Sequence, residues 1–262
     1  MRTRIVLATL TLAIVADACV SDSSVAPDKP AGTLDVALSE VTLPALDYAS
    51  ATFSGAGIVT PAIVPSRCQF DGASGTFVCG ALSGNGLTLN QYFTLLDGTG
   101  AKQSAYDMST TAGLVVNSAV SGTATGYVGS NAVTLTVDGQ QELTLSGLGT
   151  AQHTVNGTSL TLTTLARSDN SDPPLTSTIT TKVVDLVIPV PGPNDPAPWP
   201  TSGMIELQST TDLGYVIPLA AANTTTSAAM QFNGSSVVKL TITTQSGTQS
   251  CSVDITTTML GC

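Results

Sequence analysis

The feature that most constrains this chain is a period of two in its hydropathy. Apolar and polar residues alternate in Val133–Gly147 (VTLTVDGQQELTLSG), Gln152–Leu165 (QHTVNGTSLTLTTL) and Met230–Ile242 (MQFNGSSVVKLTI). Because successive side chains of a β-strand point to opposite faces of the sheet, this alternation predicts half-buried strands. We therefore expect an all-β protein, an antiparallel hairpin meander that forms a sandwich or a barrel-like curled sheet.

Each of these three stretches contains a dipeptide that is typical of tight hairpin turns. The dipeptides are Asp138-Gly139, Asn156-Gly157 and Asn233-Gly234. Type I′ turns need positive φ at both central residues, which glycine and asparagine tolerate. The pattern therefore predicts three hairpins, with positive φ at Gly157 and Gly234.

Further strands are expected where the same alternation recurs. They are Leu34–Thr42, Ala51–Ile58, Leu87–Asp97, Leu114–Thr125, Ser177–Ile188, Met204–Thr210 and Thr248–Asp254. No segment has a convincing helical period, and Ala220–Met230 is the best helical fragment. Threonine, a good strand former, takes many of the outward positions in these segments.

A proline-rich stretch interrupts the strands. Pro189 to Pro200 (PVPGPNDPAPWP) holds six prolines and is incompatible with a strand interior. It is either a long surface loop or a linker to a final β segment, Thr201–Cys262. We favour the loop, and so expect a single β domain over residues 33–262 with a proline-rich loop at 189–200.

The cysteines form two pairs of equal spacing, Cys68/Cys79 and Cys251/Cys262. If each pair lies directly opposite in a hairpin, Phe70 faces Phe77 and Val253 faces Leu260. Directly opposed residues bring their Cα atoms to a separation that a disulfide bridges. The spacing therefore predicts two hairpin disulfides with a structural role, whereas zinc sites pair cysteines at shorter spacing.

The first residues, MRTRIVLATLTLAIVADACVSDSS, combine a basic start with an apolar run of about twelve residues, the length of a signal-peptide core. Ala16-Asp17-Ala18 then precedes the fifth cysteine, Cys19. This arrangement resembles a bacterial lipoprotein signal, in which a small residue precedes the lipidated cysteine. The family usually has leucine where Ala16 stands, and ordinary A-x-A cleavage would cut the same bond.

The resemblance implies that residues 1–18 are a signal peptide and that Cys19 carries lipid. Residues 19–32 are rich in Ser, Asp, Pro and Ala, a composition typical of a flexible tether. We expect an exported protein held by its lipid in the cell envelope, at the outer membrane or the cell surface. Without lipid on Cys19 it would be periplasmic or secreted. Beyond the signal, the chain resembles the uncharacterised β-rich secreted proteins of bacterial genomes.

Composition narrows the range of partners. The formal net charge is −10, and charged residues make up 10% of the chain. Nucleic acids need Lys and Arg to neutralise their phosphates, so the acidic balance argues against a nucleic-acid partner. The expected partners are the membrane, reached through the lipid anchor, and an envelope or extracellular component of unknown identity.

Candidate residues for chemistry are few. His153, the single histidine, and Ser74 lie near predicted turns, and most aspartates neighbour Gly, Pro or Ser, which favours a turn role. Asp169, Asn170 and Asp172 form a weak candidate calcium site without EF-hand spacing. Trp199, between two prolines, is a weak candidate for stacking on a ligand.

These observations predict no cofactor, no metal site beyond that weak calcium candidate and no catalytic residue. The expected function is a non-enzymatic structural or binding role for a lipid-anchored envelope β domain. The alternative is an exported hydrolase that acts on glycans through loop carboxylates, because glycosidases need a pair of carboxyl groups at a fixed separation.

Overall fold

The computed structural model describes residues 67–128, 131–167, 174–190, 199–212, 223–244, 247–254 and 259–261, and every regular element in these ranges is a β-strand. The strands are β1 (Cys68–Asp71), β2 (Thr76–Cys79), β3 (Leu82–Gly84), β4 (Leu87–Asp97), β5 (Lys102–Gln103), β6 (Thr111–Val128), β7 (Asn131–Ser146), β8 (Gln152–Arg167), β9 (Leu175–Pro189), β10 (Ser202–Asp212), β11 (Asn223–Gln231), β12 (Val237–Thr244), β13 (Gly247–Asp254) and β14 (Met259–Gly261).

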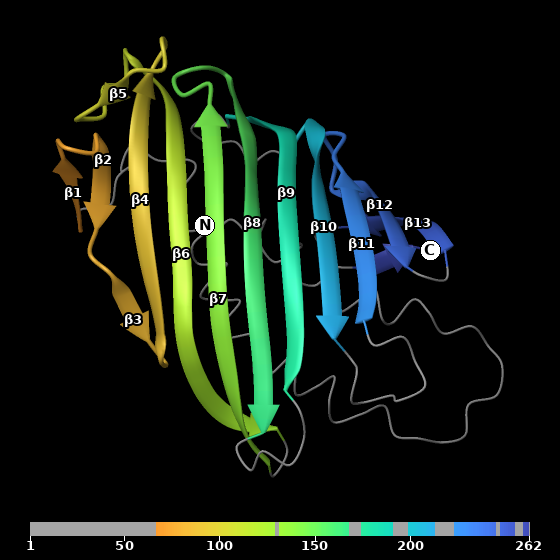
Figure 1. Ribbon diagram of the computed structural model, residues 1–262. Coiled ribbons are helices and arrows are strands. Elements are labelled where there is room, and N and C mark those ends of the chain that lie inside the picture. Colours follow the sequence, from red (N-terminus) through yellow and green to blue (C-terminus); the bar gives the residue numbers. More distant parts are fainter. Residues whose placement is uncertain are drawn as a thin grey trace.

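All fourteen strands belong to one antiparallel sheet in the order β1-β2-β4-β6-β7-β8-β9-β10-β11-β12-β13-β14, with β3 and β5 paired to β4. The expected hairpin meander is therefore confirmed. The sheet curls, so that β12 and β13 stand behind the plane of β6–β9 (Figure 1). Within the described residues it is neither closed nor stacked on a second sheet, and β1 and β14 lie at its two ends.

Most expected strands are confirmed. β4 has the predicted bounds Leu87–Asp97, and the predicted segments at 114–125, 177–188, 204–210 and 248–254 lie within β6, β9, β10 and β13. The best helical fragment, Ala220–Met230, instead contributes to strand β11 in its described part. The candidates Leu34–Thr42 and Ala51–Ile58 lie outside the described residues.

Two of the three predicted turns are wrong. β7 runs without interruption through Asp138-Gly139, and β8 runs through Asn156-Gly157. Both glycines mark close packing, which is the other common reason for glycine in a strand. A Cβ at Gly139 would lie 2.9 Å from Val120 Cγ1, and one at Gly157 would lie 2.3 Å from the carbonyl oxygen of Glu142. Gly157 accordingly has no positive φ.

The third predicted turn and one unpredicted turn do connect strands. Gly234 has φ +85° in the connection between β11 and β12, as expected. Asn233 does not share the positive φ that a type I′ turn would need. Asn85 and Gly86, with φ +54° and +81°, form the tight turn between β3 and β4. The Asn-Gly signal was thus reliable only where it fell between two strands that pair with each other.

The first cysteine hairpin has the predicted register. Cys68 lies opposite Cys79 and Phe70 opposite Phe77, with the two rings 5.2 Å apart. A disulfide joins Cys68 to Cys79, whose Cα atoms are 3.8 Å apart, slightly closer than the usual disulfide range. The bridge ties β1 to β2 at the end of the sheet, where β1 has a single neighbour.

The second cysteine hairpin is described in part. β13 and β14 pair with Val253 opposite Leu260 and Asp254 opposite Met259, the register that the sequence predicts. Cys251 is disulfide-bonded. Its predicted partner, Cys262, lies outside the described residues, so the Cys251–Cys262 bridge stays a prediction.

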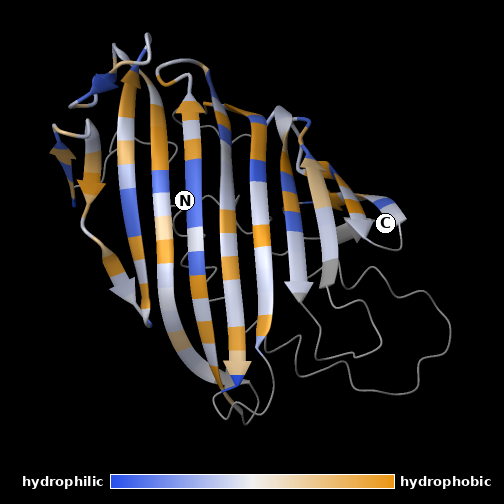
Figure 2. Ribbon diagram, viewed as in Figure 1, coloured by the Kyte–Doolittle hydropathy of each residue, from blue (hydrophilic) through white to orange (hydrophobic). Residues whose placement is uncertain are grey.

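The curl gives the sheet two unlike faces, and Figure 2 shows the hydropathy alternating along its strands. The concave face carries the core. Its larger cluster includes Phe93, Leu95, Met230 and Leu240, each no more than 1% exposed. A smaller cluster around Leu87 and Leu135 lies toward the far end of β4, β6 and β7. Along each strand, the residues that alternate with these core residues point to the convex face.

The proline-rich segment connects two neighbours of the sheet. β9 ends at Pro189 and β10 begins at Ser202, and the two strands pair along most of their length. The carbonyl oxygen of Pro200 accepts a hydrogen bond from Gly234 N at 2.8 Å. Strands on both sides of the segment therefore share one sheet. Residues 191–198 lie outside the described residues.

Candidate functional site

Three aspartates stand at turns, where a catalytic carboxylate would first be sought. Asp71 Oδ2 accepts from the Ser74 hydroxyl at 2.7 Å, and its Oδ1 accepts from Ala73 N at 3.1 Å. Asp97 Oδ1 accepts from the amide of Thr99 at 2.8 Å and from its hydroxyl at 2.7 Å. Asp107 Oδ1 accepts from Ser109 N at 2.8 Å. The predicted turn role of aspartate is confirmed at these positions.

These hydrogen bonds also fix the charge of the carboxylates. The pKa of Asp71 lies below its usual value, mainly because of the Ser74 hydroxyl. The Thr99 hydroxyl and the Ser109 hydroxyl lower the pKa of Asp97 and Asp107 in the same way. A general acid at neutral pH needs a raised pKa. These three groups are therefore suited to holding turns rather than to donating protons.

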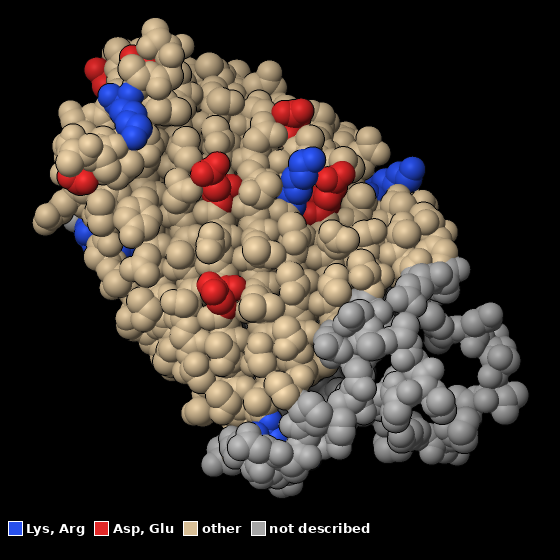
Figure 3. Space-filling model, in the orientation of Figure 1, with Lys and Arg blue, Asp and Glu red and all other residues tan. Residues whose placement is uncertain are grey.

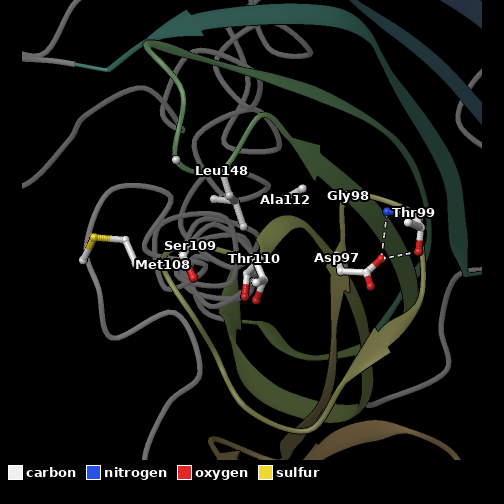
Figure 4. Close-up of a pocket in the computed structure, with 10 residues that line it drawn as sticks. Asp97, Gly98, Thr99, Met108, Ser109, Thr110, Ala112 and Leu148 are labelled. Carbon is white, nitrogen blue, oxygen red and sulfur yellow. Dashed lines mark hydrogen bonds between the residues drawn. The ribbon is translucent and has the colours of Figure 1, made fainter.

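A hollow of about 440 Å³ lies at the end of the sheet where β4 meets the turns before β6 and after β7. Figure 4 shows the Asp97 carboxylate directed toward Thr99 on one side, with Met108 on the opposite side and Leu148 between them. Met108 is 74% exposed. The lining combines hydroxyl groups with a few apolar atoms, so the hollow suits a small amphipathic group.

One wall of this hollow is held by a polar network. The Thr111 hydroxyl donates to Gln103 Oε1 at 2.6 Å and accepts from Asp107 N at 2.9 Å. The Gln103 amide donates to the Thr110 hydroxyl at 2.9 Å. Thr111 is 3% exposed, so the network fixes the turn from inside.

The convex face extends over the neighbouring strands β7–β12. It presents exposed, uncharged polar side chains on neighbouring strands: Thr136, Gln140, Thr158, Thr180, Gln208, Thr225 and Thr243. Charged side chains are few on it, and in one place a basic and an acidic side chain lie next to each other (Figure 3). One ion pair, Lys182–Glu206 at 3.7 Å, bridges β9 and β10.

Cross-strand pairs of hydroxyl groups and two exposed leucines are the main features of this face. Thr210 and Thr225 hydroxyls lie 3.2 Å apart across β10 and β11, and those of Thr243 and Thr248 lie 3.0 Å apart across β12 and β13. Leu160 and Leu162, two residues apart on β8, are 50% and 42% exposed. They form an apolar strip in the middle of a hydroxyl-rich surface. Sequence alone did not single them out, because the Asn156-Gly157 dipeptide suggested a turn close by.

The concave face carries a feature that the sequence analysis missed. Five polar residues lie at one level across five neighbouring strands, between the two apolar clusters: Gln91, Ser118, Gln141, Ser159 and Thr181. We call them the polar row. Gln91 and Ser118 are 5% and 9% exposed, and the Arg67 guanidinium donates to Gln91 Oε1. The sequence does contain a signal for this row, because a polar residue stands at a position where the alternation would place a buried apolar one, for example Gln91 between Leu89 and Phe93.

The other sequence candidates have ordinary surroundings or lie elsewhere. His153 pairs with Ile188 on the concave face, and burial lowers its pKa. Ser74 belongs to the Asp71 turn. Trp199 is half-buried beside the buried Pro200. The lipidation candidate Cys19 and the calcium candidates Asp169, Asn170 and Asp172 lie outside the described residues.

The described ranges contain no group of three His, Cys, Asp or Glu side chains arranged to hold a metal ion. They also contain no helix with the length and hydropathy of a membrane span. Comparison with protein-family models, with curated proteins and with solved structures finds no match to this chain.

Proposed function

We propose that this protein is an exported, lipid-anchored β domain of the cell envelope, with a non-enzymatic binding role, and that it binds its partner through the convex face. The observation that carries this proposal is the exposed strip of Leu160 and Leu162 within a hydroxyl-rich surface, where Asp138 lies opposite Leu162. Large exposed apolar side chains on a broad strand face are typical of interaction surfaces.

The chemistry of this face favours an uncharged, hydroxyl-bearing polymer, such as a neutral polysaccharide. Thr and Gln side chains both donate and accept hydrogen bonds, as sugar hydroxyls do. The leucine strip offers an apolar surface to the C–H groups of a sugar ring. Anionic polymers find few cations here, because Lys182 is engaged by Glu206, Lys239 is the other lysine of this face, and Asp138 and Glu142 repel anions.

The residues around Cys19, at the N-terminal end of the chain, support the proposed lipid anchor. The apolar run ending at Ala16, the small residues before Cys19 and the tether 19–32 favour lipidation followed by a flexible stalk. A stalk would leave the sheet free to turn its convex face to a partner. The Cys68–Cys79 bridge agrees with an exported protein, because disulfides persist in oxidising compartments.

A glycan hydrolase is the less favoured function. Asp71, Asp97 and Asp107 use their carboxylate oxygens within their own turns, and their pKa values are lowered rather than raised. Inverting and retaining glycosidases both need a carboxyl group that stays protonated until it donates. The hollow at the end of the sheet therefore supports binding better than hydrolysis.

The proposal is tested with the full chain and insoluble or bead-coupled amylose, dextran and cellulose, with the anionic polysaccharide alginate for comparison. We expect retention on at least one neutral matrix and none on alginate. The variant Leu160→Glu/Leu162→Glu should lose at least about tenfold in affinity, because a charge replaces apolar contact at the centre of the face.

The control variant is Gln69→Glu, which adds a charge at an exposed position of the edge strand β1. It should bind like the unaltered chain. Equal binding by the leucine variant and the control would refute the convex face as the binding surface. Release of reducing sugar from a neutral matrix would favour the hydrolase instead.

A further inference from the structure

The direction of the leucine strip is set by the strand that carries it. Leu160 and Leu162 both belong to β8, so the line from one to the other runs along this strand, over about 7 Å. The strip continues into uncharged side chains on the same face, Thr158 at one end and Thr164 at the other. A slender ligand that lies along β8 would therefore contact both leucines at once.

The curl of the sheet favours the same direction. β12 and β13 stand behind the plane of β6–β9, whereas β7, β8 and β9 run side by side along nearly straight paths in Figure 1. A stiff polymer laid across the strands would lose contact with the convex face where the sheet turns back. A polymer laid along β8 would not meet that bend.

Two acidic side chains flank the strip on β7. Asp138 lies opposite Leu162 and Glu142 lies opposite Thr158, and both acidic side chains are exposed. Among the residues that the structure describes, neither carboxylate has a hydrogen-bond or ion-pair partner. A carboxylate only accepts hydrogen bonds, and bonds to a charged acceptor are stronger than bonds between neutral groups. Asp138 and Glu142 thus offer strong, free acceptors to a ligand that is rich in hydroxyl donors.

The other flank of the strip, on β9, carries hydroxyl groups. Thr178 lies opposite Leu162, and Thr180 lies opposite Leu160. Threonine hydroxyls both donate and accept hydrogen bonds. The strip therefore has carboxylate acceptors on one side and hydroxyls on the other. This arrangement suits a sugar ring, which presents an apolar C–H face and hydroxyl groups around its edge.

We propose that one neutral polysaccharide chain lies along β8, with sugar rings on Leu160 and Leu162 and with hydroxyl groups donating to the carboxylates of Asp138 and Glu142. This inference rests on the proposed function, to which it adds the direction of the ligand and its acceptors. Asp138 and Glu142 are four residues apart on β7, about 13 Å along the strand, so a ligand that reaches both is an oligomer. Polymers that carry anionic groups are repelled by the same two carboxylates.

Isosteric variants of the full chain test the acceptors. The probe is the soluble hexasaccharide of the neutral matrix that retains the protein: maltohexaose for amylose, isomaltohexaose for dextran or cellohexaose for cellulose. Asp138→Asn/Glu142→Gln should lower its affinity about tenfold, because charged acceptors become neutral ones. The control, Glu206→Gln, alters an acid of the same face that is already paired with Lys182, and affinity should stay within about twofold. Unchanged affinity in the double variant would overturn the acceptor role.

A photoreactive form of the same hexasaccharide tests the direction. A diazirine is attached at the reducing end, the complex with the full chain is irradiated, and mass spectrometry maps the adducts. We expect adducts near either end of the strip, within residues 152–157 or 164–167 of β8 or beside them on β7 and β9. Adducts mainly on β10 and β11, or on β4 and β6, would show that the ligand crosses the strands and would overturn the proposed direction.

The two proposals fail in different ways. Full binding by Leu160→Glu/Leu162→Glu would reject the convex face as the binding surface, and the present inference with it. Loss of binding in the leucine variant, together with unchanged binding in Asp138→Asn/Glu142→Gln, would keep the convex face and reject only the acceptors proposed here.

Discussion

Asn156 on β8 and Asp185 on β9 hold each other at a bulge. The backbone N–H of Asp185 donates to Asn156 Oδ1 at 2.8 Å, and Asn156 Nδ2 donates to Asp185 Oδ1 at 3.1 Å. Asp185 has φ +45°, and the register shifts between Val155 and Gly157. Opposite, a Cβ at Gly203 would lie 2.4 Å from the carbonyl oxygen of Asp185. The pair thus fixes the register of the central strands.

Asn156→Ala should therefore destabilise the protein by about 1–2 kcal/mol, since it leaves the Asp185 amide without its side-chain acceptor. Asp185→Gly keeps that amide and relieves the positive φ, which offsets the loss of the exposed Asn156 Nδ2–Asp185 Oδ1 hydrogen bond, so its effect should stay within about 0.5 kcal/mol. Urea unfolding followed by circular dichroism measures both. Equal losses of stability in the two variants would mean that the Asn156 acceptor is not what holds the bulge.

Asn156-Gly157 also shows why part of the fold could not be predicted from the sequence. The alternation identifies strands correctly, because burial of one strand face requires an apolar residue at about every second position of the sequence. A turn depends on which strands pair, and that register is a tertiary property. Asp138-Gly139 has the composition of a turn, yet its glycine serves the contact with Val120. The β1–β2 hairpin was predictable because the spacing of the two cysteines indicates which residues lie opposite each other.

The candidate surfaces were less predictable still. Gln91, Ser118 and Gln141 each break an apolar alternation in their own strand, but nothing in one strand says that the breaks align across the sheet. Leu160 and Leu162 become a strip only once β8 is known to run through the Asn-Gly dipeptide. Sequence thus identified the residue types, and the register supplied their arrangement.

The disulfides should be separate and structural. Peptide mapping of the non-reduced protein should give Cys68 linked to Cys79, and Cys251 linked to Cys262. The second link is expected because Ser252 pairs with Gly261, and the same register continued by one residue would place Cys251 opposite Cys262. Cys68→Ala/Cys79→Ala should cost roughly 3 kcal/mol by the chain-entropy account. A peptide that links Cys251 to any residue other than Cys262 would show that the second hairpin has been assigned wrongly.

Acid should destabilise the fold through the turn aspartates. The pKa values of Asp71, Asp97 and Asp107 are lower in the folded than in the unfolded chain, so their stabilising contribution is complete above the unfolded pKa and is lost as pH falls through the folded pKa. The triple Asp→Asn variant should show a weaker fall in stability between pH 6 and pH 3, measured by urea unfolding at each pH. The same acid dependence in variant and unaltered protein would assign the effect to other groups.

The anchor is tested by Cys19→Ser. In the producing cells, the unaltered protein should incorporate labelled palmitate and fractionate with membranes. The variant should take up no label and remain in the soluble fraction, with an unchanged melting temperature after purification. An unaltered protein that is soluble and unlabelled would favour A-x-A cleavage without lipidation.

Hydroxyl-radical footprinting tests the binding face most directly, because the two candidate surfaces carry reactive side chains that mass spectrometry separates. Leu160 and Leu162 report on the convex face, and Met108, 74% exposed, reports on the hollow at the end of the sheet. With a soluble neutral polysaccharide that binds the protein, oxidation of both leucines should fall while that of Met108 stays constant. Protection of Met108 with unchanged oxidation of Leu160 and Leu162 would contradict the account and place the ligand in the hollow.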